Sequence, residues 1–351
     1  MSATTSLPGG PRTGVWTFPD GDAFALVELA EQIEGLGFDE WWLGDEGPAR
    51  EPFSVLSAAA MRTSRIRLGI GISNPFTRHP ALTTTTAHTL HELSGGRAIL
   101  GVGAGGELAL GPFQLRVTKP VSAVDRFIRI ARAVATRSAT EGYVPADGAV
   151  GNREDLPALP LYVGARGEML NRLASRVADG AFVSGIAPLF YEDTLRWIRH
   201  EHPIDVALYS SVAFTEQEIE KLRPQMIWAL HNSPEATRRR LDVDDGELEQ
   251  AVATMRNGDD TLARAFVTDS LLREVLVVGS PEEVGLRLGE FVRMHRPTSI
   301  GLALATADVR GATVRAAAAM AVMRASLLER DERPDYPPQV NGDVHDRTET
   351  R

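Results

Sequence analysis

The chain has 351 residues, a formal net charge of -10 and no cysteine. The acidic balance argues against general affinity for nucleic acid or for an anionic membrane surface, although it is compatible with a local basic pocket for a phosphate. Without cysteine, disulfides, thiolate metal sites and cysteine nucleophiles are impossible.

The sequence carries no sign of a targeting or membrane segment. Residues 1–11 lack the positive and apolar regions of a signal peptide. No apolar run approaches the roughly 20 residues that a helix needs to cross a bilayer. We therefore expect a cytoplasmic protein without a membrane partner.

The first hundred residues alternate short apolar runs with segments of helical periodicity. Residues 1–12 are rich in Ser, Thr, Pro and Gly, which predicts a flexible tail. Strands are predicted at 14–18, 40–43, 66–72 and 98–102, and helices between them at 24–36, 53–62 and 81–93. This alternation is typical of a parallel sheet or barrel.

The second part of the chain continues the alternation less regularly. Further strands are predicted at 161–163, 181–183, 206–214 and 299–305, and helices at 121–137, 169–178, 191–200, 281–295 and 312–328. Residues 215–275 are predicted to form a helical insertion late in the barrel, and residues 331–351 a disordered tail. Eight strands with intervening helices favour a single (β/α)8 TIM barrel over residues 13–330, rather than an open doubly wound sheet.

Two acids directly follow the second predicted strand, at the end of a barrel that carries catalytic residues. They are Asp45 and Glu46. One carboxyl group can hydrogen-bond a ring or ribityl hydroxyl. The other can act as a general acid or base if burial raises its pKa. The alternative is a solvated turn that caps the next helix.

The residues after the fifth and sixth predicted strands are suited to binding an anion. Arg166 and Gly167 follow the fifth strand and precede a helix, where backbone N–H groups and the helix dipole favour a phosphate that Arg166 can pair with. Ser184 and Gly185 hold the corresponding place after the sixth strand. Together they predict an anion site between neighbouring strand ends. The alternative for Arg166 is a surface salt bridge.

The segment Gly101–Gly106 fits the G-x-G-x-x-G dinucleotide fingerprint, and Asp125 lies about 20 residues further on. That fingerprint opens a helix in the first βαβ unit, whereas three strands precede it here and the following residues, 107–112, are short and broken by glycine and proline. We interpret the segment, including Gly105, as a glycine turn whose backbone makes room for a flat ring system.

The sequence patterns do not favour a metal site at the histidines of this region or substrate binding at its tryptophans. His79, His88 and His91 form no zinc motif, so no metal site is predicted. Trp41 and Trp42 are neighbours in a strand and must face opposite sides of it. Neither is assigned to substrate.

Several motifs carry a resemblance to a known family. They are EGLGFD at 34–39 with WLGDE at 42–46, RLGIGISNPFTRHP at 67–80, and LSGGRAILGVGAG at 93–105. The chain resembles the bacterial luciferase-like flavin- and deazaflavin-dependent oxidoreductases, over about residues 14–305. It is most similar to their coenzyme F-420 branch, which includes methylenetetrahydromethanopterin reductase and the F-420-dependent glucose-6-phosphate dehydrogenases.

The resemblance implies a (β/α)8 barrel with the cofactor at its C-terminal rim, in a homodimer. It places a non-proline cis peptide behind the deazaflavin ring at Gly71 and Ile72, an acid near the cofactor at Asp45, and the phosphate loop at Arg166 and Gly167. The chain departs from the family's pattern in part. Several relatives carry His in place of Glu46, and glycine where this chain has Arg166. Glu107 falls near a family acid.

The resulting hypothesis is an oxidoreductase that transfers a hydride between a small organic substrate and coenzyme F-420 at the barrel mouth. Glu46 handles the proton, with Glu107 as the second candidate. One alternative is an FMN-dependent monooxygenase that uses dioxygen and is fed by a separate flavin reductase. Another is a barrel that binds a cofactor without catalysis. Substrate specificity is expected in residues 215–275 and 141–160, which carry no readable motif.

Overall fold

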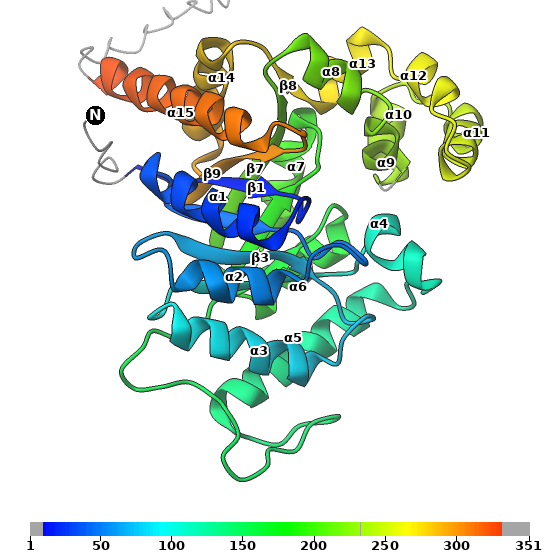
Figure 1. Cartoon of the computed structure of the whole chain (residues 1–351). Helices are drawn as coiled ribbons and strands as arrows, with labels where there is room; N and C mark the ends of the chain where they lie inside the picture. The colour runs from blue at the N-terminus through cyan, green and yellow to red at the C-terminus, as the bar shows by residue number, and fades with distance from the viewer. Residues whose placement is uncertain (1–9, 232, 332–351) are drawn as a thin grey trace, which may run out of the picture.

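Eight parallel strands close into a barrel in the computed structural model, which describes residues 10–231 and 233–331 (Figure 1). Each strand pairs with its neighbour in the chain from β1 to β7, and β9 closes the ring between β7 and β1. The strands are β1 Arg12–Thr17, β2 Glu40–Leu43, β3 Arg67–Ser73, β4 Ala98–Gly103, β5 Leu161–Gly164, β6 Gly180–Ser184, β7 Asp205–Ala213 and β9 Ser299–Leu304. The (β/α)8 barrel predicted from the sequence is confirmed.

Helices surround the barrel, as the ribbon shows (Figure 1). The barrel helices are α1 Ala23–Gly35, α2 Pro52–Ala60, α3 Pro80–Leu93, α5 Pro120–Thr136, α6 Glu168–Val177, α7 Tyr191–Ile198, α14 Pro281–His295 and α15 Val309–Asp331. The short α4, Glu107–Leu110, follows β4. Within the described residues, no helix has the length and apolar character that crossing a membrane requires.

The described residues of the segment 215–275 form helices, as the sequence predicts. They are α8 Glu216–Leu222, α9 Met226–His231, α10 Glu235–Arg240, α11 Asp245–Arg256, α12 Thr261–Phe266 and α13 Asp269–Val275. A two-residue strand that the sequence did not predict, β8 Val277–Val278, then pairs with the end of β7. These helices lie on the same side of the barrel as α4 (Figure 1).

Aromatic side chains fill the barrel. Trp42 points inward and packs on Phe182, with ring centroids 4.4 Å apart, and on Tyr162 at 5.5 Å. Its neighbour Trp41 lies in the outer hydrophobic layer, where its indole N–H donates to Thr17 Oγ1 at 3.0 Å. The two tryptophans therefore face opposite sides of β2, as predicted, and the barrel has a solid core.

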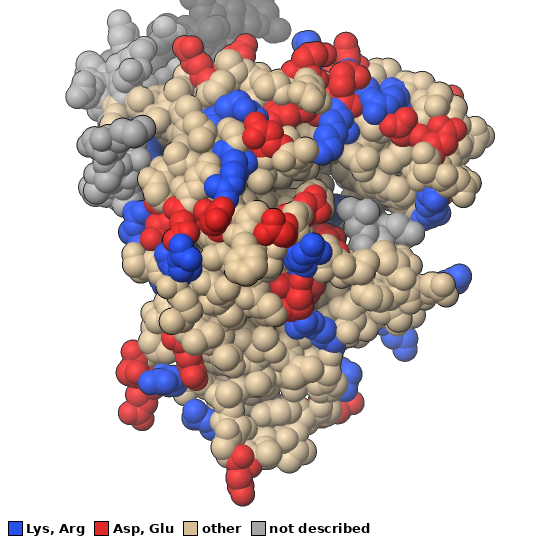
Figure 2. Space-filling view, in the orientation of Figure 1, with Lys and Arg blue, Asp and Glu red and all other residues tan. Residues whose placement is uncertain are grey.

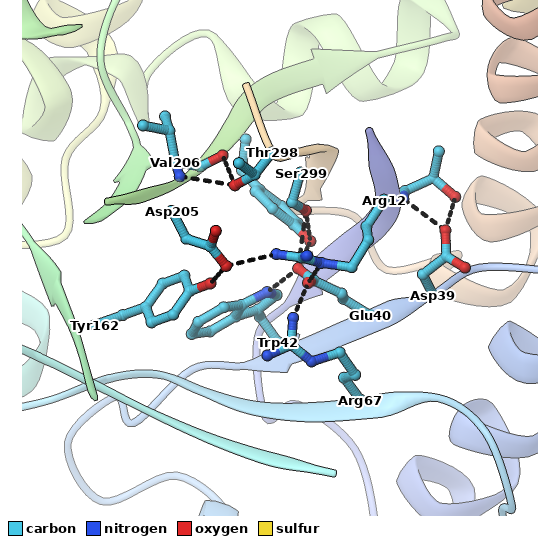
Figure 3. A network of polar contacts seen from close by, with 12 residues as sticks. Arg12, Asp39, Glu40, Trp42, Arg67, Tyr162, Asp205, Val206, Thr298 and Ser299 are labelled. Carbon is cyan, nitrogen blue, oxygen red and sulfur yellow. Dashed lines mark hydrogen bonds and ion pairs between the residues drawn. The ribbon is translucent and has the colours of Figure 1, made fainter. Parts of the chain in front are cut away.

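A polar network closes the N-terminal end of the barrel around Glu40, which is 1% exposed (Figure 3). Arg12 and Arg67 pair with its carboxylate at 2.7 and 2.8 Å, and Ser299 donates to it at 2.8 Å. Burial alone acts to raise the pKa of Glu40, but the two guanidinium groups outweigh it and hold the pKa below its ordinary value. The network is remote from the catalytic end and serves stability.

The inner boundaries of both predicted tails differ from the structure, because one residue assigned to each tail belongs to a regular element. Arg12, the last residue of the expected N-terminal tail, opens β1 and pairs with Glu40. Asp331, the first residue of the expected C-terminal tail, is the last residue of α15. The other residues of the two predicted tails that lie in 1–9 and 332–351 are outside the described residues.

The segment 141–160 has little regular structure, as expected, but its position contradicts the role proposed for it. It lies beside α3 and α5, at the lower edge of Figure 1. Pro157 O lies 2.8 Å from His91 Nε2 of α3, and the N–H of Asn152 donates to Ala135 O of α5. The segment enters β5 at the N-terminal end of the barrel. The expectation that it contributes to substrate specificity is therefore wrong.

Candidate active site

Asp45 lies just beyond β2 at the C-terminal end of the barrel, and it is held by the next strand. The hydroxyl of Ser73, the last residue of β3, donates to Asp45 Oδ2 at 2.6 Å. Burial raises the pKa of Asp45, and the Ser73 hydrogen bond acts in the opposite direction. The sequence singled out Asp45 but missed Ser73, whose only local signal is a polar residue at the end of an apolar strand.

Glu46 has the property that a proton-handling residue needs. Burial, and secondarily the neighbouring charge of Asp45, raise its pKa to about 7, while Arg166 acts to lower it. A carboxyl with this pKa exists in both protonation states near neutral pH, so it can accept or donate a proton. The condition set in the sequence hypothesis, that burial raises the pKa of one of the two acids, is met at Glu46.

The peptide between Gly71 and Ile72 is cis, at the position that the family resemblance implied. The β3–β4 register shifts between Ile70 and Ser73, so β3 carries a bulge here. The indole N–H of Trp16 donates to the carbonyl of Gly71 and ties the bulge to the barrel interior.

Glycines of β4 and β5 make room for the side chain of Ile72. A Cβ placed on Gly101 would lie 2.7 Å from Ile72 Cγ2, and one on Gly164 would lie 2.5 Å from Ile72 Cδ1. A Cβ on Gly103 would also overlap Ile72 Cδ1. The interpretation that this glycine segment directly accommodates a flat ring is therefore wrong for its first two glycines. A Cβ on Gly106, in contrast, would meet no atom within 4 Å.

The loop after β3 is braced by its own polar residues. Asn74 Oδ1 accepts hydrogen bonds from the backbone N–H groups of Phe76 and Thr77, which folds the loop into a turn. Arg78 pairs with Glu51 at 2.8 Å. These contacts hold the loop that directly follows the bulge and Ser73.

The loops after β5 and β6 meet at the mouth. The guanidinium of Arg166 lies against Gly185, since a Cβ on that glycine would lie 2.6 Å from Arg166 Nη2. Gly185 has φ +64°, and it directly follows Ser184, the last residue of β6. The structure thus brings together the two strand ends that the sequence combined into one anion site.

Arg166 is a desolvated cation with no direct partner among the described residues. Burial lowers its pKa, and the charge of Glu46 acts to raise it, although the two groups form no ion pair within 4.0 Å. The surface salt bridge considered as an alternative is absent from the part of the chain that the structure describes. Gly167 forms the N-cap of α6, and a Cβ on it would meet nothing within 4 Å. A cationic residue therefore directly precedes a helix N-cap that has free space beside it.

Two predicted features contribute less. Glu107 opens α4, but its side chain lies outside the described residues, so its role stays a prediction. Gly105 lies between β4 and α4 with φ +73°. His88 and His91 are buried in α3. Among the described residues, no group of three His, Asp or Glu side chains is placed to hold a metal.

The sequence model of the luciferase-like monooxygenases matches residues 3–296, and the chain belongs to this family. Among curated relatives, the 5,10-methylenetetrahydromethanopterin reductase of Methanolobus tindarius is 27% identical over 293 residues, covering 80% of this chain and 90% of the relative. The F-420-dependent glucose-6-phosphate dehydrogenase of Nakamurella multipartita is 28% identical over 291 residues, with coverages of 75% and 84%.

Solved structures agree on the fold. The coenzyme F-420-dependent tetrahydromethanopterin reductase from Methanopyrus kandleri superposes with a TM-score of 0.74 at 24% identity, covering 88% of this chain and 97% of the other. The family and the barrel architecture inferred from the sequence motifs are both confirmed.

Proposed function

We propose that this protein is an oxidoreductase that transfers a hydride between a small organic substrate and coenzyme F-420 at the C-terminal mouth of the barrel. The observation that carries the proposal is the grouping of Asp45, Glu46 and Arg166 at this mouth: Asp45 and Glu46 are neighbouring acids with raised pKa values, and Glu46 is close enough to the unpaired Arg166 guanidinium for each charge to act on the other. The names of the relatives support F-420 as the cofactor.

The residues at the mouth fit a phosphate-bearing deazaflavin. Arg166 and the N-terminus of α6 offer a cation and backbone donors to a phosphate. Gly106 and Gly167 leave open space where side chains would intrude. Asp45, held by Ser73, offers a fixed acceptor to a ring N–H or a hydroxyl. The Gly71–Ile72 bulge supplies an apolar backing.

Bound F-420 supplies a carbon, C5, that accepts or releases a hydride. The chain's part is to orient the substrate and to manage the proton. A deprotonated Glu46 oxygen can accept a proton from the substrate when it is oxidised, and a protonated one can return it in the reverse direction. Because its pKa is about 7, both forms are populated at neutral pH.

The second candidate is a monooxygenase that uses FMN and dioxygen with a separate flavin reductase. The description of the matching family favours it, because the family is named for monooxygenases. Anaerobic turnover distinguishes the two candidates. F-420 chemistry predicts a substrate-dependent change in F-420 absorbance without oxygen, whereas the alternative predicts oxygen uptake that needs reduced FMN. Failure of both assays would favour a non-catalytic cofactor-binding barrel.

We further propose a homodimer. Large apolar side chains are exposed on α1, at the C-cap of α2 and on α3, with Phe24, Met61 and Leu82 at 85, 68 and 61% exposure. Charged side chains are few over α2 and α3 in the lower part of Figure 2. Light scattering after gel filtration tests the proposal, and Leu82→Glu should shift the protein from twice the chain mass towards a monomer. A monomeric wild-type protein would refute it.

A further inference from the structure

The side chain of Trp16 connects the aromatic core of the barrel with the candidate active site. Trp16 lies near the end of β1, belongs to the same inner cluster as Trp42 and Phe182, and is 9% exposed. Phe18, directly beyond β1, packs edge-on against it, with ring centroids 4.6 Å apart and ring planes at 75°. Because the carboxyl ends of the strands form the catalytic end of such a barrel, Trp16 and Phe18 lie near the mouth.

One edge of the Trp16 indole faces the β3 bulge. The indole N–H donates to the carbonyl of Gly71, and a Cβ placed on Gly71 would lie 3.1 Å from Trp16 Cδ1. The same Cβ would lie 3.1 Å from Cβ and Cε3 of Trp42. Gly71 therefore lies against tryptophans of both β1 and β2, and the hydrogen bond from Trp16 restrains the bulge relative to β1.

The same indole edge continues to the turn that carries Glu46. A Cβ placed on Gly44 would lie 3.1 Å from Trp16 Cζ2 and 3.1 Å from Glu46 Cγ, the methylene carbon next to the carboxyl group. The two side chains therefore border the same small space. Cζ2 is separated from the indole nitrogen by a single ring atom, so one edge of Trp16 contacts the bulge and also borders Glu46. The N–H of Gly44 donates to Thr17 O at 3.0 Å, which ties this turn to β1.

Trp16 gives the Glu46 carboxyl an apolar neighbour. The single hydrogen-bond donor of the indole is engaged at Gly71, so the ring offers the carboxyl carbon-bound hydrogens only. An apolar ring edge displaces water from a carboxyl group and thereby favours its protonated form. Among the described residues, the charges that act on the pKa of Glu46 oppose each other, since Asp45 raises it and Arg166 lowers it. Burial is the largest cause of the raised pKa, and Trp16 contributes to it from the β1 side.

We propose that Trp16 is a positioning residue for the proposed reaction: its indole excludes water from one side of Glu46 and holds the β3 bulge in a fixed place beside that acid. Trp16 acts through Glu46 and Gly71 and has no chemical step of its own. The catalytic meaning of this inference rests on the proposed function, because only that function gives Glu46 a proton to transfer. The shielding of Glu46 is, in contrast, a property of the protein without cofactor.

The test measures the pKa of Glu46 in the full-length protein without cofactor, by NMR of carboxyl-labelled glutamate. The Glu46 signal is the one that disappears in Glu46→Gln, and in wild type it should titrate at about 7. Trp16→Phe removes the N–H and the ring atoms around Cζ2, and should move the pKa by at least about 1 towards its ordinary value of 4.5. An unchanged pKa in the folded variant, or a wild-type pKa near 4.5, would overturn the proposal.

Trp41→Phe is the matched control. Trp41 is another buried tryptophan that donates its N–H, but it lies in the outer hydrophobic layer and its hydrogen bond goes to Thr17. The same change there removes a similar amount of packing and should leave the pKa of Glu46 as in wild type. An equal shift in Trp41→Phe and Trp16→Phe would mean that general loosening of the barrel moves the pKa, which would overturn the role of Trp16.

A second measurement serves if Trp16→Phe fails to fold by circular dichroism. The chain has five tryptophans, so wild type gives five indole N–H signals in NMR. One of these signals should shift with the same midpoint as Glu46, and that shift should be absent from Glu46→Gln. If no indole signal follows the titration of Glu46, Trp16 does not border that carboxyl and the proposal is wrong.

Titration with F-420 separates this inference from the proposed function. Trp16→Phe should weaken F-420 binding several-fold because the bulge loses its anchor, whereas Trp41→Phe should bind as wild type. A pKa of Glu46 that depends on Trp16, in a wild-type protein that does not bind F-420, would refute the proposed function and leave the shielding by Trp16 standing. F-420 binding together with a pKa that does not depend on Trp16 would do the reverse.

Discussion

Glu46 is predicted to lower the stability of the folded protein, and removing its charge should therefore stabilise it. Glu46→Gln keeps the shape of the side chain and removes its ionisation. The carboxyl is desolvated and has a charged neighbour in Asp45, with only partial compensation from Arg166. A carboxyl group that is desolvated and lies beside a like charge destabilises the folded state whenever it is ionised.

The size and pH window of the effect follow from the two pKa values. The pKa of Glu46 is about 7 in the folded protein against an ordinary value of 4.5. Below pH 4.5 the group is protonated in both states and costs nothing. As pH rises, the unfolded state loses its proton first, so stability is lost progressively until the pH exceeds the folded pKa. The full difference corresponds to about 3 kcal/mol at most, and because Glu46 is partly exposed about 1–3 kcal/mol is expected.

Urea unfolding of both proteins at pH 5 and pH 9 measures this difference. The Gln variant should exceed wild type by about 1–3 kcal/mol at pH 9 and by much less at pH 5. Glu141→Gln, at an exposed loop position, is the matched control and should change stability at neither pH. An equal effect of Glu46→Gln at both pH values, or destabilisation at pH 9, would refute the proposed environment of Glu46.

Three further predictions concern the charges of Glu46, His88 and Glu40. Glu46→Gln should reduce turnover, measured by stopped flow, about a hundredfold or more, while the affinity for F-420, measured by titration, stays within a few-fold. Equal losses of turnover and affinity would refute the proton-handling role of Glu46. Burial lowers the pKa of His88 to about 4 from 6.5, so the unfolded state is protonated first and stability should fall as pH drops from 6.5 towards 4. His88→Gln should lose less stability over that range in thermal melts, and identical pH curves would contradict this. Glu40→Leu leaves Arg12 and Arg67 without their carboxylate. It should lower the free energy of unfolding, measured in urea, by about 3–5 kcal/mol. A decrease of less than about 1 kcal/mol would contradict the stabilising role of the network.

The order of the elements could be predicted because its signals are local. The helix predicted at 281–295 has the same bounds in the structure, since Ser280 and Glu283 form a capping box around Pro281. Prediction failed where a tertiary or unusual local contact overrides propensity. Helix α15 begins three residues before the predicted start, although it includes Gly311, because the Asp308 carboxylate accepts a hydrogen bond from the Gly311 N–H and caps the first turn.

Long-range pairs explain what the sequence did not reveal. Arg12 was assigned to a tail because its partners Glu40 and Asp205 are 28 and 193 residues away in the chain. The same holds for Ser73, whose bond to Asp45 spans 28 residues. The rim positions of Asp45 and Arg166, in contrast, were accessible because the end of a parallel strand can be read from the sequence. Their charges and partners required the folded chain.

The most direct test of the central claim is a pair of titrations of the purified protein without cofactor, one with F-420 and one with FMN, followed by fluorescence. The proposed function predicts micromolar or tighter binding of F-420 and much weaker binding of FMN. Arg166→Met should weaken F-420 binding about tenfold or more if the guanidinium holds a phosphate of the cofactor. Preferential binding of FMN, or binding of neither compound, would contradict the account.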